Sequence, residues 1–306
     1  MDFINAEKIK IILITGFLGS GKTTFLNKLV NFYSQRKIAL IVNDFGKIAV
    51  DGILLQNKID NELNTKMYEI SNGSIFCSCL STELVNALKF FITKKPEILI
   101  IETSGLSDPS TFHKILKDNK LEKYYDIYNS VCIVDTIKTI QLLKKITVIE
   151  KQIISSNIIV INKVDLINET EIYKVVQEIK ILNNKAIIIA TSYVEFDLEI
   201  LEKNKKQNFS INSNTCNTVN NRPGTLFLEQ QEMTINKLEN FYERVNRYIL
   251  RIKGFLKINE KLYYVSNNND KLKIENKDSY KITDYGLSVI SYRGSENKIE
   301  KEWKRI

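Results

Sequence analysis

Residues 16–23 read Gly-Phe-Leu-Gly-Ser-Gly-Lys-Thr, a complete G-x-x-x-x-G-K-T phosphate-binding loop. Glycine is needed there because the backbone must curl closely around phosphate oxygens and present successive N–H groups to them. An apolar, β-branched run at 10–15 precedes the loop, and apolar residues at helical spacing follow it over 22–35. The order of strand, loop and helix therefore predicts a nucleotide-binding P-loop domain.

The residue types of this phosphate loop each have an expected task. The ammonium of Lys22 should lie near the β- and γ-phosphates and act in catalysis, and the hydroxyl of Thr23 should bind magnesium. Direct contacts with the nucleotide are expected from Gly16, Gly19, Ser20, Gly21, Lys22, Thr23 and Thr24.

The tetrapeptide Asn-Lys-Val-Asp at 162–165 indicates which base is bound, because it closes an apolar run at 158–161. The carboxylate of Asp165 can accept hydrogen bonds from the ring N–H and the exocyclic amine of guanine. Asn162 can reach the other edge of the purine, and the stem of Lys163 can lie along its ring. Adenine lacks that amine and would leave a buried carboxylate without its partners, so we expect GTP rather than ATP.

A GTPase also needs groups that sense the γ-phosphate, and two loops that directly follow predicted strands carry such groups. In the second loop, Glu102 ends a fully apolar strand and is expected to hold magnesium through water, while the amide of Gly105 is expected to contact the γ-phosphate. In the first loop, Asp44 or Asp51 is expected to orient the attacking water, and the sequence leaves both open.

Strand-like and helical patterns alternate over the first two thirds of the chain. This alternation predicts an α/β fold of the P-loop NTPase type, with a mostly parallel sheet and helices on both faces. Strands are expected at 10–15, 38–43, 97–102, 130–135, 157–161 and 186–190, and helices at 22–35, 82–92, 109–118, 136–153, 168–182 and 195–203.

The last third of the chain predicts a small α+β domain. Its patterns indicate strands at 225–230, 248–257, 261–265, 271–275 and 288–292 and a helix at 235–246. The stretch before it is rich in asparagine and serine and has no periodicity. We therefore expect a GTPase domain at 1–204, a linker at 205–222 and the α+β domain at 223–306.

The composition of the 306 residues restricts the class of protein. No apolar stretch approaches the roughly 20 residues of a membrane span, and four cysteines are too few and too unevenly spaced for a secreted disulfide framework. We expect a cytoplasmic protein with reduced thiols. The net charge of +8 is spread as single lysines, so a nucleic-acid partner is not expected and would require salt-sensitive RNA binding.

Five motifs in this order make the chain resemble the CobW-like metallochaperone GTPases, relatives of HypB and UreG. These motifs are the phosphate loop at 16–24, Asn-Asp-Phe-Gly at 43–46 with Asp51, Glu-Thr-Ser-Gly-Leu-Ser-Asp-Pro at 102–109, Asn-Lys-Val-Asp-Leu at 162–166 and Arg-Ile-Lys-Gly-Phe at 251–255. The resemblance implies slow GTP hydrolysis coupled to delivery of zinc, cobalt or nickel, or to corrinoid metabolism. It also implies that the C-terminal domain contacts a client, such as a metalloenzyme or a corrinoid protein.

The chain departs from that family at the cysteine motif. The family has Cys-x-Cys-Cys after Asn-Gly, whereas this chain has Cys77 and Cys79. Two sulfurs make an incomplete site for a soft metal, but a homodimer would supply four thiolates for a tetrahedral site. The alternative is a pair of free thiols, in which case the protein would be a GTP-gated interaction protein that recruits or reactivates a client without carrying metal. The sequence leaves the metal, the client and the oligomeric state open.

Overall fold

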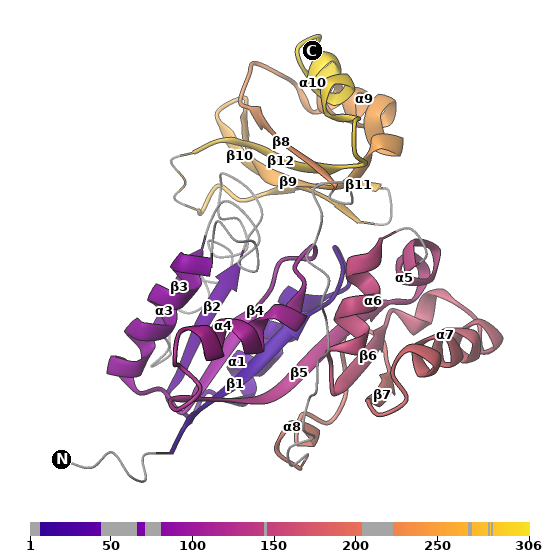
Figure 1. Ribbon diagram of the computed structural model, residues 1–306. Helices are drawn as coiled ribbons and strands as arrows, with labels where there is room; N and C mark the ends of the chain where they lie inside the picture. The colour runs from indigo at the N-terminus through magenta and orange to yellow at the C-terminus, as the bar shows by residue number, and fades with distance from the viewer. Residues whose placement is uncertain are drawn as a thin grey trace. The chain divides into compact units, whose positions relative to one another are not determined.

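The computed structural model describes residues 7–43, 66–70, 81–143, 146–203, 223–268, 271–280, 282 and 284–306. These residues form two compact units, one that ends at residue 203 and one that begins at residue 223 (Figure 1). Each unit has its own sheet and its own apolar core.

A seven-stranded parallel sheet forms the centre of the first unit. In spatial order its strands are β3 (Lys66–Ile70), β2 (Ile38–Asn43), β4 (Ile98–Glu102), β1 (Ile9–Thr15), β5 (Tyr125–Asp135), β6 (Ile158–Asn162) and β7 (Ile187–Ala190). The register places Ile14 of β1 opposite Glu102 of β4, and Thr15 opposite Cys132 of β5. Because the strands run in one direction, the loops after β1, β4, β5 and β6 meet at one edge of the sheet.

Helices cover both faces of this sheet. They are α1 (Lys22–Phe32), α3 (Ser81–Lys94), α4 (Phe112–Asp118), α5 (Thr136–Leu143), α6 (Thr147–Ile154), α7 (Glu169–Leu182) and α8 (Ile200–Lys203). Residues of α3 and α4 share a buried cluster with Ile11 and Leu13 of β1, so Ile12 and Ile14 face the other side, where α1 contacts β1 and β4. The predicted α/β fold class is confirmed.

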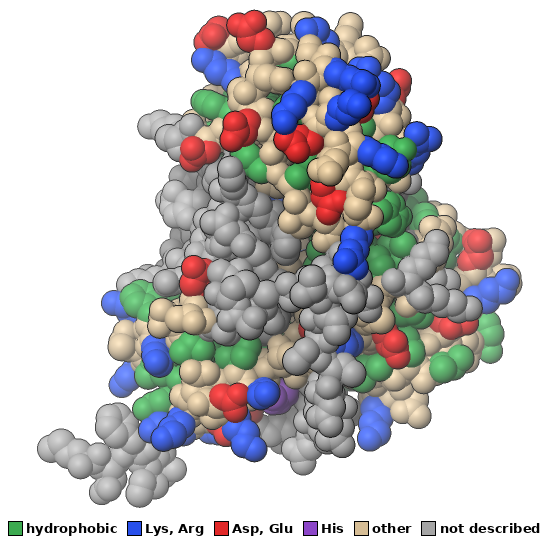
Figure 2. Space-filling view, turned by 45° about the horizontal axis from the view of Figure 1, so that its top comes forward, with side chains coloured by type: hydrophobic (Ala, Val, Ile, Leu, Met, Phe, Trp, Pro, Cys, Tyr) green, Lys and Arg blue, Asp and Glu red, His purple; other side chains and the backbone are tan. Residues whose placement is uncertain are grey.

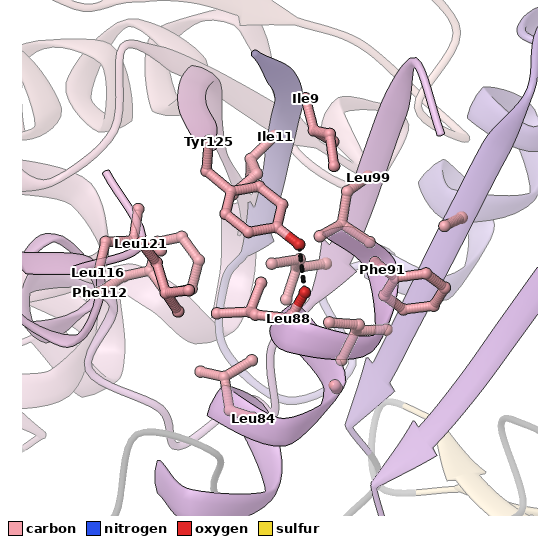
Figure 3. Packing of buried hydrophobic residues seen from close by; sticks show 14 of the residues in the cluster. Ile9, Ile11, Leu84, Leu88, Phe91, Leu99, Phe112, Leu116, Leu121 and Tyr125 are labelled. Atoms are coloured by element: carbon pink, nitrogen blue, oxygen red, sulfur yellow. Dashed lines mark hydrogen bonds between the residues drawn. The ribbon is translucent and has the colours of Figure 1, made fainter. Parts of the chain in front are cut away.

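The cluster under α3 and α4 is apolar apart from one paired hydroxyl (Figure 3). Leu84, Leu88 and Phe91 of α3 point at the sheet, and the hydroxyl of Tyr125 donates a hydrogen bond to the carbonyl oxygen of Leu88. This bond satisfies the only polar atom that the tyrosine brings into the core. The cluster fixes β1 and β4, and with them the loops that follow these strands.

The structure differs from the sequence prediction in three elements of the first unit. The helix predicted at 195–203 is reduced to α8, Ile200–Lys203. Strand β3 was not predicted, because Lys66 and Glu69 interrupt its short apolar pattern at the edge of the sheet. The helix predicted at 136–153 is instead the two helices α5 and α6. Ile146, directly before α6, is extended with φ −129° and ψ 96°, so a helix cannot continue through this residue.

The second unit is a five-stranded antiparallel sheet with two helices. Its strands lie in the order β11 (Lys271–Asn276), β10 (Lys261–Asn268), β9 (Ile249–Ile258), β12 (Gly286–Ser291) and β8 (Gly224–Glu229). The helices are α9 (Ile235–Val245) and α10 (Glu296–Trp303), which was not predicted. They meet where the rings of Phe241 and Trp303 lie edge to face at 5.0 Å, in a core shared with β9 and β12. The predicted α+β character is confirmed.

On the face drawn in Figure 2, Lys and Arg side chains are interspersed with Asp and Glu side chains among the coloured residues. None of the helices in the described residues has the length and the apolar composition of a membrane span.

Candidate nucleotide-binding site

The phosphate loop joins β1 to α1 in a conformation that requires glycine at two close contacts. Gly16 has φ 134°, and a Cβ atom there would lie 2.2 Å from the carbonyl oxygen of Ile133 in β5. Gly21 has φ 116°, and a Cβ atom there would lie 2.6 Å from Nδ2 of Asn162. The loop thus packs against two neighbouring strand ends and leads into the N-terminus of α1, where the helix dipole favours an anion.

Lys22, Thr23 and Glu102 lie together beside this loop. The buried Lys22 ammonium donates to the carbonyl oxygen of Phe17, 3.1 Å away and inside the loop. The hydroxyl of Thr23 donates to Oε1 of Glu102 over 3.0 Å, and Glu102 is only 3% exposed at the end of β4. A hydroxyl and a carboxylate side by side are the oxygen donors that magnesium prefers, so this pair fits that ion.

The loop after β4 touches the phosphate loop at Gly105. A Cβ atom on this glycine would lie 2.7 Å from the backbone nitrogen of Leu18 and 2.5 Å from its Cδ2, so only glycine permits the approach. Gly105, the predicted contact residue for the γ-phosphate, is therefore adjacent to the phosphate loop, although Leu18 and Gly105 are 87 positions apart in the sequence.

Side chains of helix α6 bind the loop after β4, a contact that the sequence did not indicate. Nζ of Lys151 lies 2.7 Å from Oδ2 of the buried Asp108, and Nε2 of Gln152 donates to the carbonyl oxygens of Gly105 (3.2 Å) and Ser107 (3.0 Å). No local motif marks Lys151 or Gln152, because their role arises only from the packing of α6 beside the loop.

Asn162 connects the base motif to the phosphate loop. Its Nδ2 donates to the carbonyl oxygen of Ser20 over 2.8 Å, and its Oδ1 accepts from the backbone N–H of Val194 at 3.0 Å. The side chain is 3% exposed. Both ends of the amide bind protein backbone, so in this structure Asn162 joins two loops, whereas the sequence argument placed it at the purine edge.

The loop after β7 completes the base end of the site. The backbone N–H of Asp165 donates to Oγ of Ser192 over 3.2 Å, and the Asp165 residue is exposed. Tyr193 and Val194 have φ values of 55° and 56°, which is unusual for two successive non-glycine residues, and the backbone N–H of Val194 is bound by Asn162. Ser192 was not predicted, although it follows an apolar strand at the same sheet edge as the other site loops.

Four predicted site residues, Asp44, Asp51, Cys77 and Cys79, lie outside the described residues, and their roles stay predictions. In the described ranges there is no group of three or more His, Cys, Asp or Glu residues that could hold a metal ion. Cys132 is buried in β5, and burial raises the pKa of its thiol to about 12, so it stays protonated at neutral pH.

Two curated proteins are each similar to less than half of this chain. The "Zinc-regulated GTPase metalloprotein activator 1" of Dictyostelium discoideum is 36% identical over 143 residues, 42% of this chain and 30% of that protein. The "Zinc chaperone CobW" of Pseudomonas aeruginosa is 32% identical over 139 residues, 44% of this chain and 35% of that protein. The chain thus spans about a third of the length of these curated relatives.

The crystal structure of the Zn(II)-bound YjiA GTPase from E. coli is similar over 98% of this chain and 99% of that chain, with 19% identity and a TM-score of 0.49. The family model "CobW/HypB/UreG, nucleotide-binding domain" matches residues 10–190, more than half of the 306 residues. The chain therefore belongs to the CobW/HypB/UreG family, the CobW-like metallochaperone GTPases, as its motifs indicated.

Proposed function

We propose that this protein binds and hydrolyses GTP and uses the cycle to deliver a metal to a client protein. One observation carries the nucleotide part of the proposal. Asn162 of the base motif donates directly to Ser20 of the phosphate loop over 2.8 Å, across 142 positions of sequence. A single nucleotide of ordinary length can therefore bind both motifs, with its phosphates at the loop and its base at Asp165.

The chemistry of this site would be positioning and electrostatic stabilisation. Amides of the phosphate loop and the Lys22 ammonium would bind phosphate oxygens and offset the charge that develops on them. Thr23 and Glu102 would hold magnesium, which supplies further positive charge when it is bound. Asp44 or Asp51 would orient the attacking water, and the amide of Gly105 would bind the γ-phosphate.

Intrinsic turnover should be slow. Residues 42–51, the proposed first switch, contain no arginine that could act as an arginine finger. A client or a bound metal would then accelerate hydrolysis by adding or ordering a missing group. GTP would order the switch loops, and hydrolysis would release them.

Replacing Asp165 by Asn tests the choice of base. The change removes a charged acceptor for two guanine donors, so the GTP dissociation constant should rise by about 100-fold. Asparagine can instead donate to the carbonyl group that xanthine carries at the position of the guanine amine, so binding of XTP should improve. Titration calorimetry with GTP, XTP and ATP measures both effects.

Glu169→Gln is the matched control, because it removes one exposed carboxylate from the first turn of α7 nearby. This variant should bind GTP like the unmodified protein. Equal weakening of GTP and ATP by Asp165→Asn would contradict the assignment of the base site.

We further propose that zinc is the metal delivered, and that Cys77 and Cys79 of two protomers bind it as a tetrahedral thiolate site. The support is that the two curated relatives described above are both named for zinc. Cobalt and nickel prefer overlapping sets of soft ligands and are the competing cargoes. The client would be a metalloenzyme or a corrinoid protein.

Metal titration of the reduced protein with a non-hydrolysable GTP analogue tests this part. We expect one zinc ion for two chains, and no stoichiometric zinc with Cys77 and Cys79 both changed to serine. Cys216→Ser is the matched control and should leave the stoichiometry unchanged. If zinc, cobalt and nickel all fail to bind, the protein is a GTP-gated protein that recruits or reactivates a client without carrying metal.

A further inference from the structure

We propose that Asp135 is a positioning residue for guanine recognition and acts through Lys163. The inference rests on the proposed binding of GTP and goes beyond it, because Asp135 belongs to none of the sequence motifs. Asp135 would order the side chain that packs on the face of the base, whereas Asp165 would bind the edge of the base.

Asp135 lies at the point where β5 meets the base motif. It is the last residue of β5, its register partner in β6 is Asn162, and it is 1% exposed. Its Oδ2 lies 2.6 Å from Nζ of Lys163, and its Oδ1 accepts from the backbone N–H of Ile137 at 3.0 Å. A carboxylate this deeply buried is stable only with such partners, so the ammonium of Lys163 is directed at this acid.

The backbone of Lys163 is held as well. Its φ of 66° and ψ of 35° are left-handed, a conformation that costs energy for a residue with a side chain. Its carbonyl oxygen accepts from the hydroxyl of Thr136 over 3.0 Å. With the backbone fixed by Thr136 and the ammonium fixed by Asp135, the four-carbon stem between them is ordered.

An ordered stem favours binding of a flat base. A free lysine side chain loses rotamer freedom when a ligand packs on it, and that loss weakens binding. Here the side chain is already ordered and is 17% exposed, so this loss occurs on folding rather than on binding. Asp165 would accept hydrogen bonds from the edge of guanine and so distinguish it from adenine, whereas the stem of Lys163 would contact the face of the ring. Asp135 should therefore affect purines with and without the exocyclic amine equally.

Dissociation constants of GDP and IDP test this inference, since inosine has the guanine ring without the exocyclic amine and neither nucleotide is hydrolysed. Asp135→Asn keeps an acceptor for Ile137 but removes the charge that holds Lys163. We expect it to weaken GDP and IDP alike, by roughly three- to tenfold. Asp165→Asn should instead weaken GDP much more than IDP.

A double-mutant cycle separates positioning from a general effect on structure. Lys163→Met keeps an apolar stem without the ammonium, so it should weaken both nucleotides, and adding Asp135→Asn to it should cause no further loss. If Asp135→Asn does not fold, Thr136→Val removes the side-chain hydrogen bond to the carbonyl oxygen of Lys163 without changing Asp135. That variant should weaken GDP and IDP alike by about threefold.

The inference is wrong if Asp135→Asn binds GDP and IDP with unchanged affinity, or if it weakens GDP alone. It is also wrong if the losses of affinity from Asp135→Asn and Lys163→Met multiply in the double variant. Where Asp135→Asn does not fold, unchanged affinity of Thr136→Val for both nucleotides has the same meaning. Its failure is distinguishable from failure of the proposed function. If the unmodified protein binds no guanine nucleotide, the proposed function is wrong; if it binds GDP and Asp135→Asn binds GDP equally, only this inference is wrong.

Discussion

Replacing Lys22 by Ala is expected to lower the rate of GTP hydrolysis by roughly 100-fold or more. Lys22 is 5% exposed, and its ammonium lies 3.1 Å from the carbonyl oxygen of Phe17 inside the phosphate loop. No other lysine or arginine belongs to the loop. Its removal leaves the amides of the loop and magnesium to offset the charge that develops on the transferred phosphoryl group.

Single-turnover measurement of phosphate release from GTP gives the rate of this step, and a binding titration shows how much affinity is lost as well. Lys28→Ala is the matched control, since Lys28 lies on the same helix with its side chain 30% exposed and 3.6 Å from Glu195. This control should hydrolyse GTP at the unmodified rate. A Lys22→Ala variant with a rate within twofold of normal would mean that hydrolysis does not occur at the phosphate loop.

Local motifs predicted the parts of the site that are contiguous in sequence. The phosphate loop and the base motif each directly follow an apolar strand. Their residue types and their place at strand ends were therefore sufficient to predict where these two loops lie in the fold. Thr23 and Glu102 were each predicted separately to bind magnesium, and these roles stay predictions. The structure brings the two side chains within 3.0 Å of each other.

The contacts between loops could not be predicted, because they depend on the order of strands in the sheet. Strand β1 lies between β4 and β5, and these are not its neighbours in sequence. That order brings Gly105 against Leu18, and the pairing of β5 with β6 places Asp135 beside Asn162. It also gives Asn162 a role as a bridge to Ser20, whereas its residue type suggested only contact with the base.

Short elements with few buried residues were missed for a different reason. Helix α10 buries only Ile299 and Trp303, which lie one turn apart and give too weak a periodic signal to distinguish from a loop. Its stability comes from tertiary contact instead, because the ring of Trp303 packs on Phe241 of α9 and its indole N–H donates to the carbonyl oxygen of Glu229 over 3.0 Å.

Two glycines of the phosphate loop should respond very differently to the same substitution. Gly16→Ala is expected to lower the free energy of unfolding by about 3 kcal/mol or more. Its φ of 134° is unfavourable for alanine, and its new methyl group would lie 2.2 Å from the carbonyl oxygen of Ile133, so β1 and β5 would have to move apart. These are adjacent strands at the centre of the sheet and cannot separate without loss of core packing.

Gly19→Ala is the matched control for this effect. Gly19 also has a positive φ, 76°, but a Cβ atom there has no neighbour within 4 Å, so only the backbone strain remains, at roughly 1 kcal/mol. Urea unfolding without nucleotide compares the two variants, because added ligand would stabilise them unequally. An equal loss of stability in both variants would show that β5 moves to accommodate the methyl group at little cost in free energy. The close packing of β1 on β5 would then not determine the conformation of the phosphate loop.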